Sequence, residues 1–197
     1  SILGKGSSVD TSEPAYDKSV GNAFDGDYNT FWATDPGHGL SEAYLIADLG
    51  GKYLINQVAY TKRIFNGSYD CTGNLLDYII EVSTDGETWK QVADGETEGG
   101  TTVITFDTVE ATHVRLTATR SYHWEEENRN KVMTAAELEI FKLVCTEHTA
   151  AEAVRENEKA PTCTEAGSYD TVVYCTVCGE EISRETVTVD ALGHTEE

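Results

Sequence analysis

The sequence has few basic residues for its length. Its 197 residues include 14 Lys and Arg against 35 Asp and Glu, and the formal net charge is −21 at pH 7. A surface this negative repels nucleic-acid phosphates and anionic lipid headgroups. We therefore expect neither nucleic acid nor a lipid surface as a partner, whereas neutral ligands and cations are compatible with the charge.

Long hydrophobic runs are also lacking. No apolar run approaches the ~20 residues of a membrane-spanning helix, and Ser1 opens directly into polar sequence without the basic and apolar regions of a signal peptide. We expect no membrane insertion, and we expect the chain to be part of a larger protein.

The usual catalytic motifs are absent as well. The sequence has no Ser/His/Asp order, no Gly-rich phosphate loop and no zinc-hydrolase helix. The run Glu125–Glu127 does not replace them, because the acid and base of a glycosidase face each other across a substrate at about 5 to 10 Å. We therefore expect a protein that is not an enzyme.

Cysteine is sparse in most of the chain and crowded in its last quarter. Cys71 lies alone, and the other four cysteines all follow Val144. Hydrophobic residues make up 39% of the chain, which is enough for a packed core. We expect a domain boundary near Val144, with domains at residues 1–144 and 145–197.

The sequence of the first domain predicts β-structure. Short runs rich in Val, Ile, Tyr and Thr are separated by Gly, Asp and Asn, and none keeps a helical period for three turns, so an all-β sandwich is expected. Two long polar loops, Arg63–Asn74 and Arg120–Thr134, lie between the runs and are long enough to be functional. The expected strands are Tyr44–Leu49, Tyr53–Lys62, Asp77–Thr84, Thr101–Phe106, Thr112–Thr119 and Ala136–Leu143.

One stretch, NAFDGDYNTFW at Asn22–Trp32, has the composition of a metal-binding corner. Asp25, Asp27, Asn29 and Thr30 offer hard oxygen ligands, and the glycine between the two aspartates allows a tight turn, so a cation with 6 to 8 oxygen ligands is favoured. Calcium is the first hypothesis. A solvated Asp/Asn/Gly turn is the alternative.

The order of motifs in this domain resembles a known family. NAFDGDYNTFWATD, LIADLG, VAYTKR, DYIIEVSTDGETWKQVADG, ATHVRLTAT and TAAELEIF resemble the discoidin (coagulation factor 5/8 type C) domain, and within it the family 32 carbohydrate-binding modules. The resemblance covers roughly residues 1–144. It implies a jelly-roll β-sandwich with a structural calcium and a shallow sugar site formed by loops at one end.

The resemblance also implies a calcium ligand set that joins the first loop to the last strand. The implied ligands are the backbone carbonyls of Asn22, Asp27 and Ala136, the side chains of Asp25 and Glu137, and Thr30. The ion would then stabilise the fold and take no part in catalysis.

For the sugar site, the resemblance implies an arginine, a histidine, an asparagine and an aromatic side chain. Arg63 matches the arginine, and its alternative role is a surface salt bridge. The histidine is missing, because the chain reads Trp32-Ala33-Thr34, and His38 is the candidate substitute. The remaining candidates are Asn66 or Asn74 for the asparagine, and Tyr122 or Trp124 for the stacking face, with His123 beside them. Trp124 has the alternative of covering a core edge.

The last quarter of the chain predicts a cross-linked unit. Cys175 and Cys178 form a CxxC followed by glycine, which is typical of a metal-binding knuckle, and a segment of ~50 residues with few large apolar side chains needs a crosslink. The segment resembles the tandem TC...CxxCG...LGH repeats of bacterial surface proteins. The implied zinc ligands are His148, Cys163, Cys175 and Cys178, with Cys145 and His194 as competing ligands.

A disulfide framework is the second interpretation of these cysteines, and a redox role is the third. The His-Thr of His148-Thr149 recurs at His194-Thr195, as a second repeat would begin.

Together these features predict a non-catalytic module that binds terminal galactose, N-acetylgalactosamine or a related sugar of host glycans. Its parent would be a bacterial glycoside hydrolase or adhesin, secreted or attached to the cell wall, with the enzyme domains in the same polypeptide. The alternative is an architectural or protein-interaction β-sandwich without a sugar site, which Ala33 in place of histidine favours.

Overall fold

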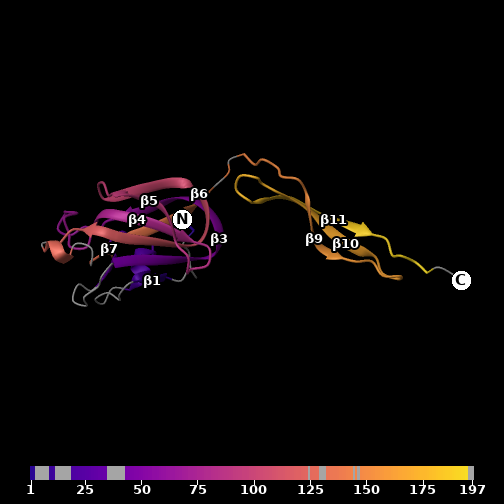
Figure 1. Ribbon diagram of the computed structural model, residues 1–197, viewed down its shortest axis with the longest axis horizontal. Coiled ribbons are helices and arrows are strands. Elements are labelled where there is room, and N and C mark those ends of the chain that lie inside the picture. Colours follow the sequence, from indigo (N-terminus) through magenta and orange to yellow (C-terminus); the bar gives the residue numbers. More distant parts are fainter. Residues whose placement is uncertain are drawn as a thin grey trace. The chain divides into compact units, whose positions relative to one another are not determined.

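The computed structural model describes residues 1–2, 9–11, 19–34, 43–123, 125–128, 132–143, 145 and 147–194. The chain divides into two compact units, Ser1–Leu143 and Val144–Glu197. The described residues are almost entirely β-structure with two short 3₁₀ helices, η1 (Val20–Ala23) and η3 (Glu126–Asn128) (Figure 1). None of their helices is long and apolar enough to span a membrane.

The first unit is an antiparallel β-sandwich, as the sequence predicts. Its main sheet has the order β1-β3-β6-β4-β5, with β8 also paired to β3, and a two-stranded sheet joins β2 to β7. The strands are β1 (Val9–Thr11), β2 (Trp32–Ala33), β3 (Ala43–Thr61), β4 (Leu75–Ser83), β5 (Lys90–Glu96), β6 (Thr101–Ser121), β7 (Thr134–Ala135) and β8 (Glu137–Lys142).

Two pairs of predicted strands are in fact single long strands. Residues 44–49 and 53–61 both belong to β3, which ends one residue before the predicted strand, and residues 101–106 and 112–119 both belong to β6. The pairing of β3 with β6 is irregular between Asp48 and Tyr53 and again between Ile55 and Gln57. Irregularities of this kind bend a strand. The first half of β3 therefore pairs with β1 and the second half with β8.

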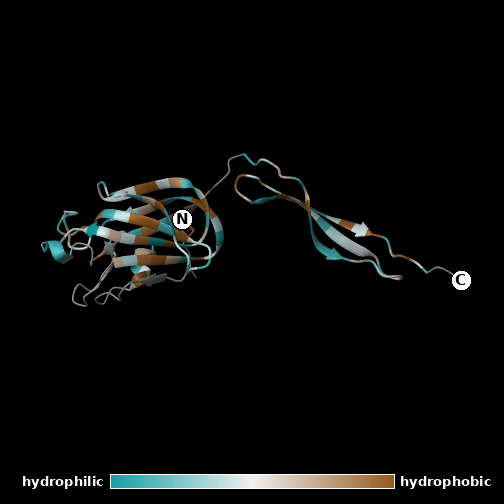
Figure 2. Ribbon diagram, in the orientation of Figure 1, coloured by the Kyte–Doolittle hydropathy of each residue, from teal (hydrophilic) through white to brown (hydrophobic). Residues whose placement is uncertain are grey.

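The core lies between the layers and follows the alternation of the strands. In the first half of β3, Ala43, Leu45, Ala47 and Leu49 are buried and the residues between them are not, as a strand with one face on a core requires. Figure 2 shows this alternation as bands along the strands of the sandwich. The largest fully buried apolar side chains are Trp32, Tyr60, Leu45, Ile55, Leu75, Ile80, Leu116, Met133, Leu138 and Ile140.

Buried contacts bring the two long loops together at one end of the sandwich. The hydroxyl of Tyr60 donates to the carbonyl of Thr134 at 2.7 Å and accepts from the N–H of Leu75 at 3.0 Å. Gly73 adopts a φ of 90° and donates to the carbonyl of Tyr122, and a Cβ there would meet Thr134 at 2.7 Å. Gly73 and Asn74 of the first loop are thus fixed beside Tyr122 and Thr134 of the second.

The second unit is a three-stranded antiparallel sheet in the order β11-β10-β9, with β9 (Val154–Lys159), β10 (Gly167–Tyr174) and β11 (Glu181–Val189). Among its described residues, Val172 and Cys175 are the buried apolar side chains. Arg184 on β11 pairs with Glu156 of β9 and Asp170 of β10, and these exposed pairs add little stability. A sheet with so small a core needs a further crosslink.

Candidate functional site

The loop after η1 gathers oxygen atoms around the hydroxyl of Thr30. This hydroxyl lies 2.8 Å from a carboxylate oxygen of Asp25, 3.0 Å from the carbonyl of Asp27 and 3.4 Å from the carbonyl of Asn22. The carboxylate of Asp27 is turned away and accepts from the backbone and side chain of Asn29, which lowers its pKa. Asp27 therefore offers its carbonyl to this cluster, as the sequence interpretation expects.

Glu137 brings a second carboxylate to the same loop from β8. It is 2% exposed, and its Oε1 accepts from the N–H of Gly26 at 2.6 Å. The pairing of Trp32 with Ala135, between β2 and β7, and a hydrogen bond from the N–H of Ala136 to the carbonyl of Thr61 hold the start of β8 in this position. The loop and the last strand of the sandwich therefore meet at Glu137.

The electrostatics of this cluster fit a cation. Burial raises the pKa of Glu137 to about 7 in the metal-free chain, the Gly26 N–H opposes this, and the nearby Asp25 raises it further. Among the described residues, no basic side chain pairs with Glu137. Two adjacent carboxylates with a hydroxyl and two carbonyls form a hard-oxygen donor set, which is the kind calcium takes.

Phe31 connects this loop with Arg63, the arginine expected at the sugar site. The carbonyl of Phe31 accepts from the side-chain amide of Asn22 at 3.1 Å. The guanidinium of Arg63 lies over the Phe31 ring, 4.8 Å from its centroid, within the range of a cation–π interaction. Nothing in the sequence pattern singled out Phe31, because a contact across loops has no local signal.

Arg63 is half-buried and only partly engaged by the protein. Its Nη2 donates to the carbonyl of Thr72 at 3.1 Å, while its Nε is buried without a partner. Thr72 and Phe31 therefore hold the guanidinium in one orientation, with Nε enclosed by the protein and out of reach of a ligand. The planar guanidinium of an arginine matches a pair of adjacent sugar hydroxyls.

The two candidate asparagines differ in burial. Asn74 is 1% exposed, and its amide bonds the backbone of Arg63 twice, the carbonyl of Tyr69 and the hydroxyl of Thr134. Its hydrogen-bonding capacity is used within the protein. Asn66 is exposed with a φ of 50°, and with Gly67 it forms the two-residue turn between Phe65 and Ser68.

The two long loops carry three exposed aromatic side chains. Phe65 is 63% exposed, Tyr69 is 42% exposed and Tyr122 is 40% exposed. Their faces are available for the C–H surface of a sugar. His123 is buried, and its Nδ1 contacts the backbone of Glu125. The candidates His38 and Trp124 lie outside the described residues.

A hollow of about 360 Å³ on the sandwich contains none of the predicted sugar residues. It lies over β4 and β5, and its carboxylates include Asp77, which Arg120 already binds at 2.6 Å. The hollow is wide open and lined by negative charge. The loop end around Arg63 has the better chemistry for a neutral sugar, because it combines a guanidinium with exposed aromatic side chains.

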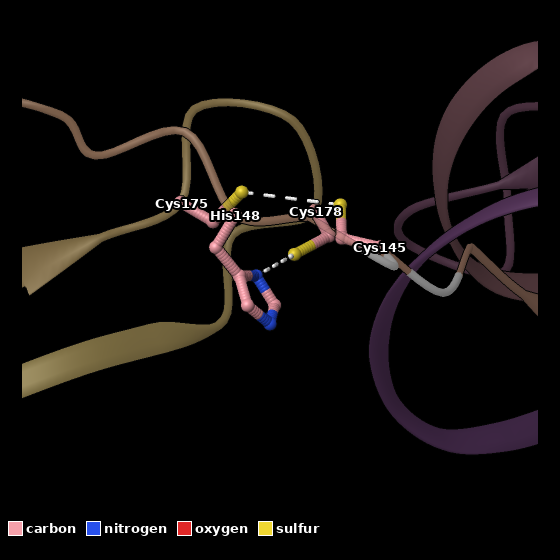
Figure 3. Close-up of side chains that lie close together, drawn as sticks. All are labelled: Cys145, His148, Cys175 and Cys178. Atoms are coloured by element: carbon pink, nitrogen blue, oxygen red, sulfur yellow. Dashed lines mark hydrogen bonds between the residues drawn. The ribbon is translucent and has the colours of Figure 1, made fainter.

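In the second unit, four side chains form a compact metal-binding arrangement (Figure 3). The ligand atoms of Cys145, His148, Cys175 and Cys178 all lie within 4.8 Å of one another. The sulfurs of Cys145 and Cys175 are 3.9 Å apart, and Cys178 lies 3.4 Å from Nδ1 of His148. All of these cysteines are free. Thiolates on one tetrahedral zinc, with Zn–S of ~2.3 Å, lie ~3.8 Å apart, so this spacing fits zinc.

Backbone N–H groups stabilise the thiolate form of Cys175, which favours binding of a cation by this cluster. The N–H groups of Cys178 and Val177 point at the sulfur of Cys175 and lower its pKa to about 5, although burial opposes them. The nearby Cys178 raises the pKa of Cys145. A thiolate beside further thiols is stable when a metal ion neutralises them.

Cys163, one of the four ligands implied by the sequence resemblance, is not in this group. It is exposed, in the turn between β9 and β10, whereas the CxxC turn joins β10 to β11 at the other end of the sheet. Cys145, the competing ligand, occupies the fourth position instead. Sequence spacing could not decide between Cys145 and Cys163, because spacing alone does not show which cysteine lies at the same end of the sheet as the CxxC turn.

Comparisons with known proteins found matches to the first unit. The F5/8 type C domain model matches residues 5–138. CpGH89CBM32-5 from Clostridium perfringens, in complex with GalNAc-β-1,3-galactose, is 28% identical over 68% of this chain and 94% of its own, with a TM-score of 0.55.

Two further solved structures from the same organism are similar. CBM32-3 from a family 31 glycoside hydrolase is 27% identical over 68% of this chain and 88% of its own, with a TM-score of 0.56. The family 32 CBM from NanJ, in complex with galactose, shares the fold at 22% identity, over 68% of this chain and 92% of its own, with a TM-score of 0.56.

Proposed function

This chain belongs to the F5/8 type C domain family, and from that premise we propose that its first unit is a non-catalytic carbohydrate-binding module for terminal galactose, N-acetylgalactosamine or a related sugar. The observation that carries the proposal is the half-buried guanidinium of Arg63, held over Phe31, in loops that expose aromatic faces. Solved relatives with this fold bind GalNAc-β-1,3-galactose and galactose.

In this proposal Arg63 donates to two adjacent sugar hydroxyls, and an aromatic side chain covers the C–H face of the ring. Tyr122 is our first choice for that face, because the carbonyl of Asn74 and the N–H of Gly73 fix its backbone beside the Arg63 loop. His38 and Trp124 stay candidates from the sequence. One sugar buries little area, so a Kd of about 0.1–1 mM is expected, and avidity through the parent protein strengthens attachment.

A glycan array followed by isothermal titration with the best terminal sugar tests the proposal. We expect Arg63→Ala to weaken binding at least about tenfold, because it removes charge-assisted hydrogen bonds. Arg155→Ala is the matched control, since Arg155 also stacks on an aromatic ring, at 4.2 Å from the centroid of Tyr169, but lies in the second unit. No binding to any terminal sugar, or no effect of Arg63→Ala, contradicts the proposal.

The second candidate function is a protein-interaction or architectural module. Ala33 supports it, because the histidine expected after Trp32 in galactose-binding relatives is missing. Exposed Ile64 and Phe65 beside Arg63 would then contact protein. The glycan array separates the two functions, since this candidate predicts no sugar binding.

We also propose that calcium binds between the first loop and β8. Its ligands are the side chains of Asp25 and Glu137, Thr30, and the carbonyls of Asn22, Asp27 and Ala136. The ion supplies structural stability by joining residues far apart in the chain. The convergence of Asp25 and Glu137 through Gly26 supports this proposal.

For the second unit we propose a structural zinc bound by Cys145, His148, Cys175 and Cys178, in a spacer that connects the module to other parts of an extracellular bacterial protein. The four ligand atoms support it by their mutual distances. Metal analysis of the purified chain is expected to give one zinc per chain. Cys145→Ser should remove it, and a disulfide between these cysteines in place of zinc contradicts the proposal.

A further inference from the structure

The long loop after β3 contains a short hairpin that begins directly after Arg63. The N–H and carbonyl of Phe65 exchange hydrogen bonds with the carbonyl and N–H of Ser68, both at 3.0 Å. Between these residues, Asn66 and Gly67 have φ values of 50° and 76°, as a two-residue type I′ turn requires. The hairpin is therefore closed at its tip and lies next in the chain to the arginine of the proposed sugar site.

The base of the hairpin is fixed as well. The buried thiol of Cys71 donates to the carbonyl of Ser68 at 3.2 Å. The side-chain amide of Asn74 donates to the carbonyls of Arg63 and Tyr69, at 2.9 and 2.8 Å. Because these bonds hold the hairpin in shape without a ligand, binding to it requires little further ordering of the loop.

Arg63 and Phe65 place their side chains on the same face of this segment. The N–H and carbonyl of Arg63 both bond the amide of Asn74, and those of Phe65 both bond Ser68, so both residues direct their backbone groups toward the returning arm of the loop. In an extended segment, alternate residues direct their backbone groups to one side and their side chains to one face. Ile64, which lies between them, therefore points to the other face.

The other face of the hairpin has a different neighbour. A Cβ on Gly100 would collide with the hydroxyl of Tyr69, so the ring of Tyr69 lies against the turn between β5 and β6. The guanidinium of Arg63, by contrast, lies over Phe31. Phe65 therefore continues the side of the loop on which Arg63 lies, whereas Tyr69 faces the β5–β6 turn.

Phe65 presents a ring to solvent on this face, since its side chain is 63% exposed. Residues 64–69 include no charged side chain, although the net charge of the chain is −21, so a neutral ligand fits the hairpin. One ring is small for a protein interface, which buries about 800 Å² per partner. It matches the C–H face of one sugar ring, and an aromatic side chain beside a few polar groups is the usual composition of a ligand site.

We propose that Phe65 forms a second sugar subsite, in which its ring packs against the second residue of a neutral glycan whose terminal sugar binds at Arg63. This inference rests on the proposed carbohydrate function. Two residues of an extended segment span ~6.6 Å, which is comparable with the length of one sugar ring, so consecutive sugars reach Arg63 and Phe65 in turn. The phenyl ring has no polar atom, so the subsite selects for a second ring and not for its hydroxyl pattern.

Isothermal titration with N-acetylgalactosamine and with GalNAc-β-1,3-galactose tests the inference. We expect the parent chain to bind the disaccharide about three- to tenfold more tightly, which is the gain that one aromatic contact gives. Phe65→Ala should reduce the affinity for the disaccharide to that for the monosaccharide and leave the affinity for the monosaccharide unchanged. Phe65→Tyr keeps the ring and should keep the gain.

Ile64→Ala is the matched control, because Ile64 is similarly exposed, at 57%, and lies on the other face. It should bind both sugars like the parent chain, whereas Arg63→Ala should weaken the binding of both. Equal affinities of the parent chain for the two sugars, a gain that survives in Phe65→Ala, or an equal loss in Ile64→Ala overturns the inference, while monosaccharide binding still supports the proposed function. If neither sugar binds, the inference fails, and the glycan array decides separately whether the proposed function fails with it.

Discussion

At the scale of single residues, Phe31 links the calcium loop to Arg63 through its contact with the guanidinium. A cation–π interaction at a partly exposed position contributes about 0.5–1 kcal/mol. We therefore predict that Phe31→Leu weakens sugar binding about two- to fivefold by isothermal titration, while calcium binding is kept. Phe31→Tyr keeps the ring face and should bind like the parent chain. Equal affinities in all three proteins contradict the role given to Phe31.

Asn74 is the second residue that decides the shape of the loop end. Its buried amide makes four hydrogen bonds, to Arg63 and Tyr69 in its own loop and to Thr134, and leaving buried partners unsatisfied costs about 1–3 kcal/mol. We predict that Asn74→Ala lowers the free energy of unfolding by at least this amount in urea titrations. Asn66→Gly is the control and should change it by less than about 0.5 kcal/mol, because glycine adopts the positive φ of that turn freely. An unchanged midpoint for Asn74→Ala argues against this role.

At the scale of elements, the contact between the η1–β2 loop and β8 predicts a pH dependence of the metal-free protein. Burial raises the pKa of Glu137 from 4.5 to about 7, so the protonated form is favoured in the folded state. The stability associated with this group is present below pH 4.5 and is lost as the pH rises through about 7. We predict that the melting temperature of the protein without calcium falls as the pH rises from 5 to 8.

Calcium should reverse this loss, because the ion binds the ionised carboxylate and its affinity therefore rises over the same pH interval. Glu137→Gln is the matched variant: it should flatten the pH dependence of the metal-free protein and abolish the calcium-induced rise in melting temperature. Differential scanning fluorimetry with calcium or with chelator measures both effects. A Glu137→Gln protein that calcium still stabilises would remove Glu137 from the site.

The sequence predicted β3, β4, β6 and β8, because apolar and polar residues alternate along parts of these strands. It divided β3 and β6, since Gly50 and Gly51 in β3 and polar residues such as Asp107 in β6 interrupt the alternation. It also missed β5, which has mostly exposed side chains at the edge of the sheet. Exposed edge strands carry little hydrophobic signal, so local patterns do not reveal them.

The candidate sites show the same limit. The family resemblance predicted that Asp25 and Glu137 lie together, and in the structure Glu137 accepts from the N–H of Gly26 and contacts the side chain of Asp25. The exchange of Cys163 for Cys145 depended on which turn lies at which end of β10. Contacts made across the fold, such as that of Phe31 with Arg63, follow from topology and have no local sequence signature.

At the scale of the whole molecule, the metals that we propose for the two units would stabilise them for different reasons. The first unit has an extensive apolar core, and calcium adds to stability that already exists. The second unit buries few apolar side chains in its described residues. For such a small domain, the free energy of metal binding is largely the free energy of folding. Zinc removal should therefore unfold the second unit and leave the first folded.

The aromatic residues allow this to be measured within the intact chain. All three tryptophans, Trp32, Trp89 and Trp124, lie in the first unit, whereas the second unit contains Tyr169 and Tyr174. We predict that a zinc-selective chelator leaves the tryptophan-detected melting temperature unchanged but removes the far-ultraviolet β signal of about a quarter of the chain. This fraction follows from the length of the second unit, residues 144–197 of 197. Calcium removal should lower the tryptophan transition alone, and a single transition that moves with both metals contradicts independent units.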